Sequence, residues 1–129
     1  MRENIAAVEN ISPELLQNLQ GILFDLDDTF TTHGKIPACS FEALWDLKNA
    51  GLTVVSVTGR PAGWCDHIAR MWPVDAVVGE NGAFYFRYDG KARRLLKRFL
   101  AGEEERAENR RRLAALRDRI LMAISSAIT

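Results

Sequence analysis

Two aspartates two residues apart follow a short apolar run, and a third aspartate and a threonine come directly after them. The run reads Gly21-Ile-Leu-Phe-Asp25-Leu-Asp27-Asp28-Thr29. An ionised carboxylate at Asp25 can attack phosphorus and form an aspartyl-phosphate, which divides hydrolysis into two easier steps. A carboxyl at Asp27 can give a proton to the leaving oxygen and later take one from water. The pattern therefore indicates phosphoryl transfer at the end of a strand.

The same loop suggests a site for a hard cation. This chemistry needs Mg²⁺ because a carboxylate and a phosphate otherwise repel each other, and Asp25 and Asp27 are the candidate ligands. Asp28 and Thr29 could support the loop through hydrogen bonds from side chain to backbone. The alternative interpretation is that Asp-Asp-Thr forms only a turn after a strand.

A second motif, Val57-Thr58-Gly59-Arg60-Pro61, closes the next predicted strand and opens a helix. A hydroxyl, a glycine that admits close backbone approach, and free amides at a helix N-terminus together make a phosphate cradle. The alternative is a plain strand-to-helix turn in which Thr58 acts as a cap. A third motif, Gly79-Glu-Asn81-Gly82-Ala83, follows the third predicted strand and by itself indicates only a glycine-rich turn.

Each of the three motifs directly follows a predicted strand. Continuous apolar or β-branched stretches predict strands at 22–24, 52–57 and 75–78, and a continuous apolar run is typical of a strand covered on both faces. In open α/β sheets ligands bind at the carboxyl ends of the strands. All three motifs fall at such ends, so we expect them to form one site.

Helix signals separate the strands. Ser12-Pro-Glu predicts a short helix that ends near Gln20, Ser40 predicts the cap of a helix through Ala50, and Pro61 predicts the start of a third helix. The apolar sides of the second and third helices consist of Phe41, Leu44, Trp45 and Leu47, and of Trp64, Cys65, Ile68 and Met71. Alternating strands and helices with short connections predict a right-handed parallel α/β layout.

The last third of the chain follows a different pattern. Stretches 83–88 and 92–96 on either side of Asp89-Gly90 predict a hairpin. A long helix is predicted from Glu103, with three glutamates at its positive end. Its apolar side consists of Leu113, Leu116, Ile120 and Ile124. The run Arg110-Arg-Arg112 is interpreted as a solvated helix face, and a phosphate-binding patch is the alternative.

Composition sets the outer bounds. The 129 residues are 47% hydrophobic, which is enough for one domain with a core. Seventeen basic and seventeen acidic residues cancel, so no attraction to nucleic acid or to an anionic membrane is predicted. The charge is uneven: residues 1–86 carry five basic and eleven acidic side chains, net −6, and residues 87–129 carry twelve and six, net +6.

Two cysteines, Cys39 and Cys65, are too few for a disulfide framework or a zinc site. Reduced thiols in a cytoplasmic protein are the expected state. The sequence shows neither the pattern of a signal peptide nor an apolar run long enough to span a bilayer, and we expect no membrane association.

The three motifs in this order resemble the haloacid dehalogenase-like superfamily. Thr58-Gly-Arg-Pro61 and Gly79-Glu-Asn-Gly-Ala83 are similar to the Cof-type branch, which includes relatives of sucrose phosphatase and mannosylphosphoglycerate phosphatase. The resemblance is strong over residues 20–86 and weaker beyond. Many members carry glycine where this chain has Asp28. The resemblance implies a partial Rossmann-like core of three parallel strands with helices, followed by the start of an α+β cap.

The resemblance also assigns roles. It implies that Asp25 is the nucleophile and a magnesium ligand, and that Asp27 is the general acid/base and lends its backbone carbonyl to the metal. It implies that Thr58 binds the phosphoryl group together with its neighbour Gly59, and that Arg60 and Asn81 lie near the substrate. The expected substrate is a small phosphorylated metabolite, of the sugar-phosphate kind.

One departure from the family limits the expected activity. The family uses a lysine that pairs with the phosphate and an acidic Gly-Asp loop that completes the metal site, and both normally follow the cap. Here residues 1–86 resemble the first part of the core and residues 87–129 only the start of a cap. Lys91 and Lys97 fall in the predicted hairpin, and no later Gly-Asp string is found. We therefore expect weak Mg²⁺ binding and low or absent turnover.

A second expectation concerns assembly. The strand that carries the nucleophile lies centrally in the family, whereas here it would form an exposed apolar edge, which tends to pair with another chain. We therefore expect a homo-oligomer through this edge. The alternative to an enzyme is a shortened, non-catalytic homologue that acts as a binding or assembly module.

Overall fold

The structure is a computed structural model that describes residues 10–124. The chain divides into two compact units between Arg98 and Phe99. The elements are α1 (Pro13–Gln17), β1 (Gly21–Asp25), α2 (Ala38–Asn49), β2 (Thr53–Val57), α3 (Ala62–Met71), β3 (Ala76–Gly79), β4 (Phe84–Asp89), β5 (Arg94–Phe99) and α4 (Glu103–Ala123). The division into a core at 1–86 and a cap segment at 87–129 stays a prediction.

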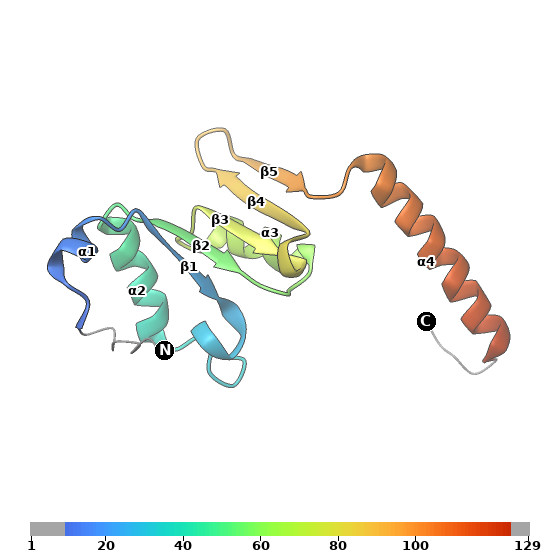
Figure 1. Ribbon diagram of the computed structural model, residues 1–129, viewed down its shortest axis with the longest axis horizontal. Helices are drawn as coiled ribbons and strands as arrows, with labels where there is room; N and C mark the ends of the chain where they lie inside the picture. Colours follow the sequence, from blue (N-terminus) through green and yellow to red (C-terminus); the bar gives the residue numbers. More distant parts are fainter. Residues whose placement is uncertain (1–9, 125–129) are drawn as a thin grey trace, which may run out of the picture. The chain divides into compact units, whose positions relative to one another are not determined.

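A single five-stranded sheet has the strand order β1-β2-β3-β4-β5 (Figure 1). The pairs β1–β2 and β2–β3 are parallel, and β4 runs antiparallel to β3. This arrangement confirms the predicted α/β class with three parallel strands. Asp25 is in register with Val57, and Val57 with Val78. The carboxyl ends of β1, β2 and β3 therefore lie at the same end of the sheet.

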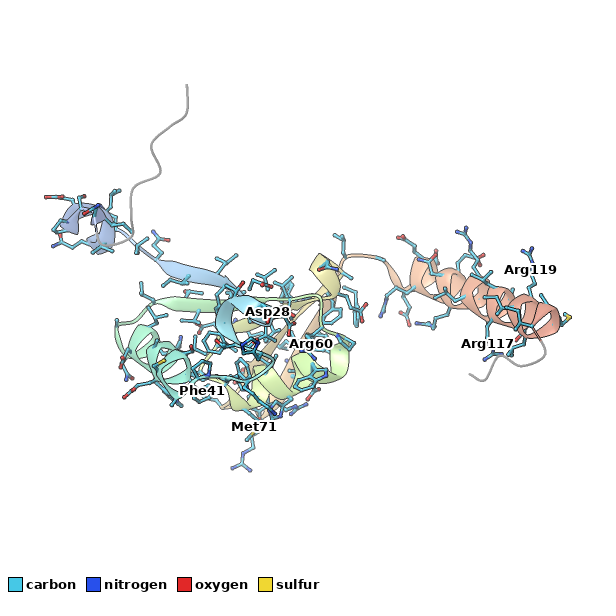
Figure 2. All side chains as sticks on the ribbon, turned by 90° about the horizontal axis from the view of Figure 1, so that it is seen from below. Asp28, Phe41, Arg60, Met71, Arg117 and Arg119 are labelled. Atoms are coloured by element: carbon cyan, nitrogen blue, oxygen red, sulfur yellow. The ribbon has the colours of Figure 1, made fainter. Side chains whose placement is uncertain are left out.

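Both crossover helices, α2 and α3, lie on the same side of the sheet (Figure 2). Right-handed crossovers that advance in one direction across a sheet place their helices on one face, and the chain advances from β1 to β2 to β3. The other face of β1 consequently has no helix against it within residues 10–124, and the Leu23 side chain is 72% exposed. The prediction that this strand is covered on both faces is therefore wrong.

The hydrophobic core lies between α3 and the sheet. Ile68, Val77 and Phe86 are each at most 1% exposed, and burial of such a side chain stabilises the fold by about 1.5–3 kcal/mol. An edge-to-face contact between Phe41 and Trp72, with ring centroids 5.7 Å apart, joins α2 to the residue that follows α3.

Helix starts were predicted with mixed success. Ser12 caps α1 as predicted, since its Oγ accepts a hydrogen bond from the Leu15 N–H at 3.3 Å. Ser40 does not cap α2. Pro37 is the N-cap instead, with φ −61°, and its carbonyl accepts the Phe41 N–H at 3.3 Å. The rigid φ of proline is suited to the start of a helix, so α2 begins before the serine.

The apolar sides of α2 and α3 are narrower than predicted. Cys65 and Ile68 are fully buried on α3. Trp64 is 52% exposed and Met71 67% exposed, and Trp45 on α2 is 52% exposed. α2 packs mainly on β2 and α3 on β3 and β4, and within the described residues these exposed side chains have no second layer over them.

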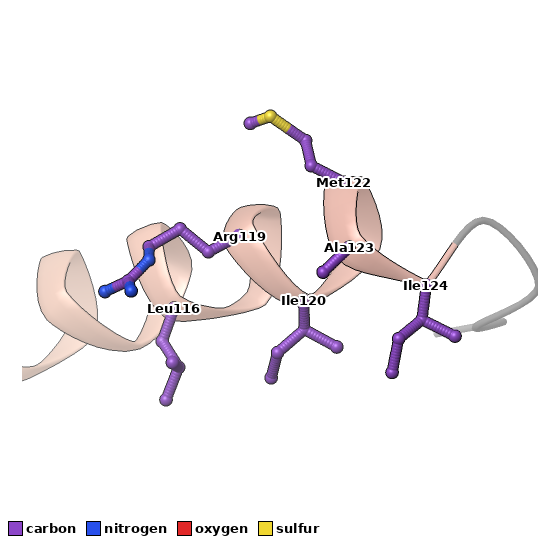
Figure 3. A pocket seen from close by; sticks show the side chains of 6 residues that line it. All are labelled: Leu116, Arg119, Ile120, Met122, Ala123 and Ile124. Atoms are coloured by element: carbon purple, nitrogen blue, oxygen red, sulfur yellow. The ribbon is translucent and has the colours of Figure 1, made fainter.

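The second unit consists mainly of α4, which begins at Glu103 as predicted. The predicted apolar side is present but exposed: Leu116, Ile120 and Ile124 project from one side of the helix and border a shallow pocket (Figure 3). The three arginines at 110–112 are exposed, as expected for a solvated face. Arg111 forms an ion pair with Glu108 at 2.6 Å, one turn away on the same helix.

Both cysteines are free thiols, as predicted. Cys39 is exposed and Cys65 is buried. Burial raises the pKa of the Cys65 thiol, so this side chain acts as a small core residue. Across residues 10–124, each helix is either too short or too polar to cross a lipid bilayer.

Candidate active site

The first loop of the site leaves β1 at Asp25 and turns back at once. Asp27 keeps extended backbone angles (φ −81°, ψ 124°), whereas Asp28 takes the left-handed conformation with φ 58°. Aspartate tolerates that conformation better than most residues. Thr29 Oγ1 donates a hydrogen bond to Asp25 Oδ2 at 2.9 Å, and the Asp28 N–H donates to Thr31 Oγ1 at 3.2 Å. The turn therefore fixes the Asp25 carboxylate.

The second loop is anchored at Thr58, which is 2% exposed. Its N–H donates to the Val78 carbonyl at 2.9 Å, and its carbonyl accepts the Asn81 N–H at 3.2 Å. Thr58 Oγ1 accepts the Arg60 N–H at 3.1 Å. One of the amides expected in a phosphate cradle is thus bound to the threonine, as in the alternative of a capped turn. No side chain caps the start of α3, where Pro61 is the N-cap.

The third loop brings Asn81 against the second. Asn81 has φ 55°, and the Glu80 N–H donates to the Arg60 carbonyl at 3.2 Å. A Cβ placed on Gly59 would lie 3.2 Å from Asn81 Oδ1. Gly59 therefore lets the two loops approach each other, and its part in a phosphate cradle stays a prediction.

Arg60 connects the second loop to the first. Its Nε donates to both carboxylate oxygens of Asp27, at 3.0 and 3.2 Å, and its terminal nitrogen donates to Asp27 Oδ1 at 2.5 Å. The guanidinium also lies over the Trp64 ring, 4.9 Å from the centroid. Hydrogen bonding to Arg60 lowers the pKa of Asp27, and Asp27 in turn raises the pKa of Arg60. Asp27 is therefore held in its ionised form.

The predicted site residues lie at the end of β1, in the case of Asp25, and in the loops that follow β1, β2 and β3. The structure bonds Thr29 to Asp25, Arg60 to Asp27, and Asn81 to Thr58. Their catalytic and binding roles stay predictions. Figure 2 marks this end of the sheet with Asp28 and Arg60. The sequence reasoning missed Trp64, in the first turn of α3, as the support of the guanidinium; an aromatic residue four positions after Arg60 was a usable signal.

The donor set for a divalent cation is incomplete. Residues 10–124 contain no group of three His, Cys, Asp or Glu side chains placed to hold a metal ion. The Asp27 carboxylate is taken by Arg60. The Asp25 carboxylate, with one oxygen bound by Thr29, and the exposed Asp28 carboxylate are the acidic side chains of this loop that Arg60 does not hold. They leave a Mg²⁺ shell incomplete, since the ion prefers six oxygen ligands in near-octahedral geometry.

Comparison with known proteins agrees with the fold and the motifs. The sequence profile of haloacid dehalogenase-like hydrolases matches residues 22–105. A solved phosphatase of the haloalkanoate enzyme superfamily from Bacteroides thetaiotaomicron is 24% identical, with a TM-score of 0.54 over 84% of this chain and 40% of that one. No curated protein matches the chain.

A second solved structure is described as showing conservation of a trigonal-bipyramidal intermediate in a phosphoryl-transfer superfamily. It is 26% identical, with a TM-score of 0.46 over 55% of this chain and 29% of that one. The chain thus spans less than half the length of either solved structure.

The profile match covers well over half of the chain, and the three loops stand where its motifs predict them. The chain therefore belongs to the haloacid dehalogenase-like hydrolase family, as its motifs had suggested. Members of this superfamily are generally phosphoryl-transfer enzymes.

Proposed function

We propose that the chain carries the nucleophile half of a phosphatase site, which hydrolyses phosphoric monoesters of small metabolites of the sugar-phosphate kind through an aspartyl-phosphate at Asp25. The observation that supports this most directly is the meeting of two carboxylates, a buried hydroxyl and a guanidinium where β1 and β2 end, at the same end of the sheet. Family membership supplies the reaction class.

In the first half-reaction a carboxylate oxygen of Asp25 would attack phosphorus while the bond to the leaving oxygen breaks. Asp27 would protonate that oxygen. In the second half, Asp27 would take a proton from the water that attacks the aspartyl-phosphate. The ion pair with Arg60 favours the ionised Asp27 that this second half needs. For the first half, Arg60 would have to leave the carboxylate, and the substrate phosphate is the natural competitor.

Mg²⁺ would offset the charge on the phosphoryl oxygens. Asp25 and the backbone carbonyl of Asp27 are its proposed ligands within this chain. Because the described donors do not complete the coordination shell, we expect weak binding, with a dissociation constant of about 1 mM or above by comparison with other weak divalent sites.

The test is phosphate release from p-nitrophenyl phosphate by the full chain across a Mg²⁺ titration. Asp25→Asn is expected to abolish release, because an amide cannot act as the nucleophile. Asp46→Asn, which changes an exposed carboxylate on α2, is the matched control and is expected to leave release unchanged. Far-UV circular dichroism would check that both variants fold. Absence of release at every Mg²⁺ concentration would contradict catalysis by this chain.

A non-catalytic role as an assembly module is the alternative function. The observation that favours it is the uncovered side of β1, where Leu23 is 72% exposed. Stable self-association without any Mg²⁺-dependent release of phosphate would support this alternative over the enzyme.

A further inference from the structure

β1 is the edge strand of the sheet, and within the described part of the chain no strand pairs with its outer side. The direction of its backbone groups follows from one bond: the Thr53 N–H donates to the Gln20 carbonyl at 3.0 Å. Along a parallel strand, alternate residues direct both backbone groups to the same neighbour. Since Gln20 faces β2, residues Gly21, Leu23 and Asp25 direct their N–H and C=O groups to the open edge.

This edge lacks the usual protection against strand pairing. Natural edge strands carry lysine, proline, a bulge or an inward-pointing charge, whereas Gly21–Asp25 reads Gly-Ile-Leu-Phe-Asp with one charge at its end. Leu23, at the centre, is 72% exposed. An unprotected apolar edge of this kind is a template for another strand.

We propose that the occupant of this edge is β1 of a second copy of the chain, paired antiparallel about a two-fold axis with Leu23 opposite Leu23. In this register Ile22 lies opposite Phe24 and Gly21 lies opposite Asp25. The pairs Leu23–Leu23 and Gly21–Asp25 are the ones whose backbone groups point outward, so they exchange their hydrogen bonds. The two five-stranded sheets become one continuous sheet.

All five residues of the strand pair with the partner strand in this register and in no other. Centring the pair on Asp25 would set the two carboxylates directly opposite each other, which is unfavourable. Centring it on Phe24 would set Gly21 and Ile22 opposite residues 27 and 26, which lie in the turn beyond the strand. With Leu23 at the centre, the two Asp25 residues are four steps apart along the strands, about 14 Å, which exceeds the Debye length of about 8 Å at physiological salt.

The test is sedimentation velocity of the full chain at about 1 to 100 μM, the range in which association of moderate affinity is seen. Wild type is expected to dimerise. Leu23→Lys and Leu23→Glu are each expected to weaken the dimer at least tenfold, because each places like charges directly opposite. An equimolar mixture of the two variants is expected to form a mixed dimer, because lysine then faces glutamate.

The mixing result is specific to this register, because it requires residue 23 to face its own copy. Tyr85→Lys is the matched control: it places a lysine at a position of β4 that is 46% exposed and away from the β1 edge, and it should leave the dimer intact. A monomeric wild type at the highest concentration overturns the proposal. So does a Leu23→Lys variant that dimerises as wild type does, or a charge-complementary mixture that stays monomeric. Circular dichroism confirms that each variant is folded.

Discussion

Gly79→Ala is expected to destabilise the protein although it adds a single methyl group. Gly79 is the last residue of β3 and leads directly into the turn that carries Asn81. A Cβ at this position would lie far inside van der Waals contact with the Phe84 ring and 2.7 Å from Cys65 Sγ. Neither neighbour has room to move, because Phe84 is 3% exposed and Cys65 is fully buried.

The expected magnitude follows from this crowding. Overpacking of a closed core costs about 1–3 kcal/mol, and the Phe84 ring is already stacked on Phe86 with centroids 4.5 Å apart, so we expect the upper part of that range. Gly63→Ala is the matched control. Gly63 lies in α3 with no atom within 4 Å of the added Cβ, and alanine is favoured over glycine in a helix by about 0.5–1 kcal/mol. The same chemical change should therefore have opposite signs at the two positions.

Urea unfolding followed by far-UV circular dichroism measures both variants. With an m-value of about 1–3 kcal/mol/M for a small protein, the Gly79→Ala midpoint should fall by about 1 M or more, and the Gly63→Ala midpoint should rise slightly. A Gly79→Ala midpoint within error of wild type would refute the reasoning, because it would mean that the core around β3 accommodates the methyl group with no loss in the free energy of unfolding. Equal shifts in both variants would refute it as well.

Two further predictions concern charge. Burial tends to raise the pKa of Asp75, but hydrogen bonds from Lys48 Nζ, 2.7 Å from both oxygens, and from a backbone amide outweigh it and lower the pKa. The depressed pKa contributes stability above the unfolded value of about 3.9, and this stability is lost as the pH falls through the folded pKa. The fall in the urea midpoint from pH 7 to pH 3 should therefore be smaller in Asp75→Asn than in wild type. An equal fall in both proteins would contradict this. Arg60→Gln should raise the pKa of Asp27, which is measured from the ¹³C shift of its carboxyl group. Arg70→Gln, which breaks the separate ion pair on α3, should leave that pKa unchanged. An unchanged pKa of Asp27 in Arg60→Gln would show that the pair does not form in solution.

Much of the site could be predicted from local sequence. The order of apolar stretches predicted three parallel strands. Asp25, Thr58 and Asn81 follow the predicted apolar stretches directly, which placed them at the same end of the sheet. Such predictions succeed because strand alternation and the right-handed crossover are fixed by backbone sterics, whatever the rest of the chain does. The residue types at the strand ends are typical of phosphoryl transfer, and their catalytic and binding roles stay predictions.

Other properties were decided only when the chain folded. The ion pair between Arg60 and Asp27 joins residues 33 positions apart, and no local pattern specifies which carboxylate a guanidinium will reach. The exposure of Leu23 has the same origin: its apolar character is local, but whether a layer covers it depends on where later segments pack. Sequence alone determines which groups are delivered to the site and in what order, because backbone geometry is a local property. The tertiary structure determines which of those groups are bound, buried or left open, because contact and burial depend on the packing of distant segments.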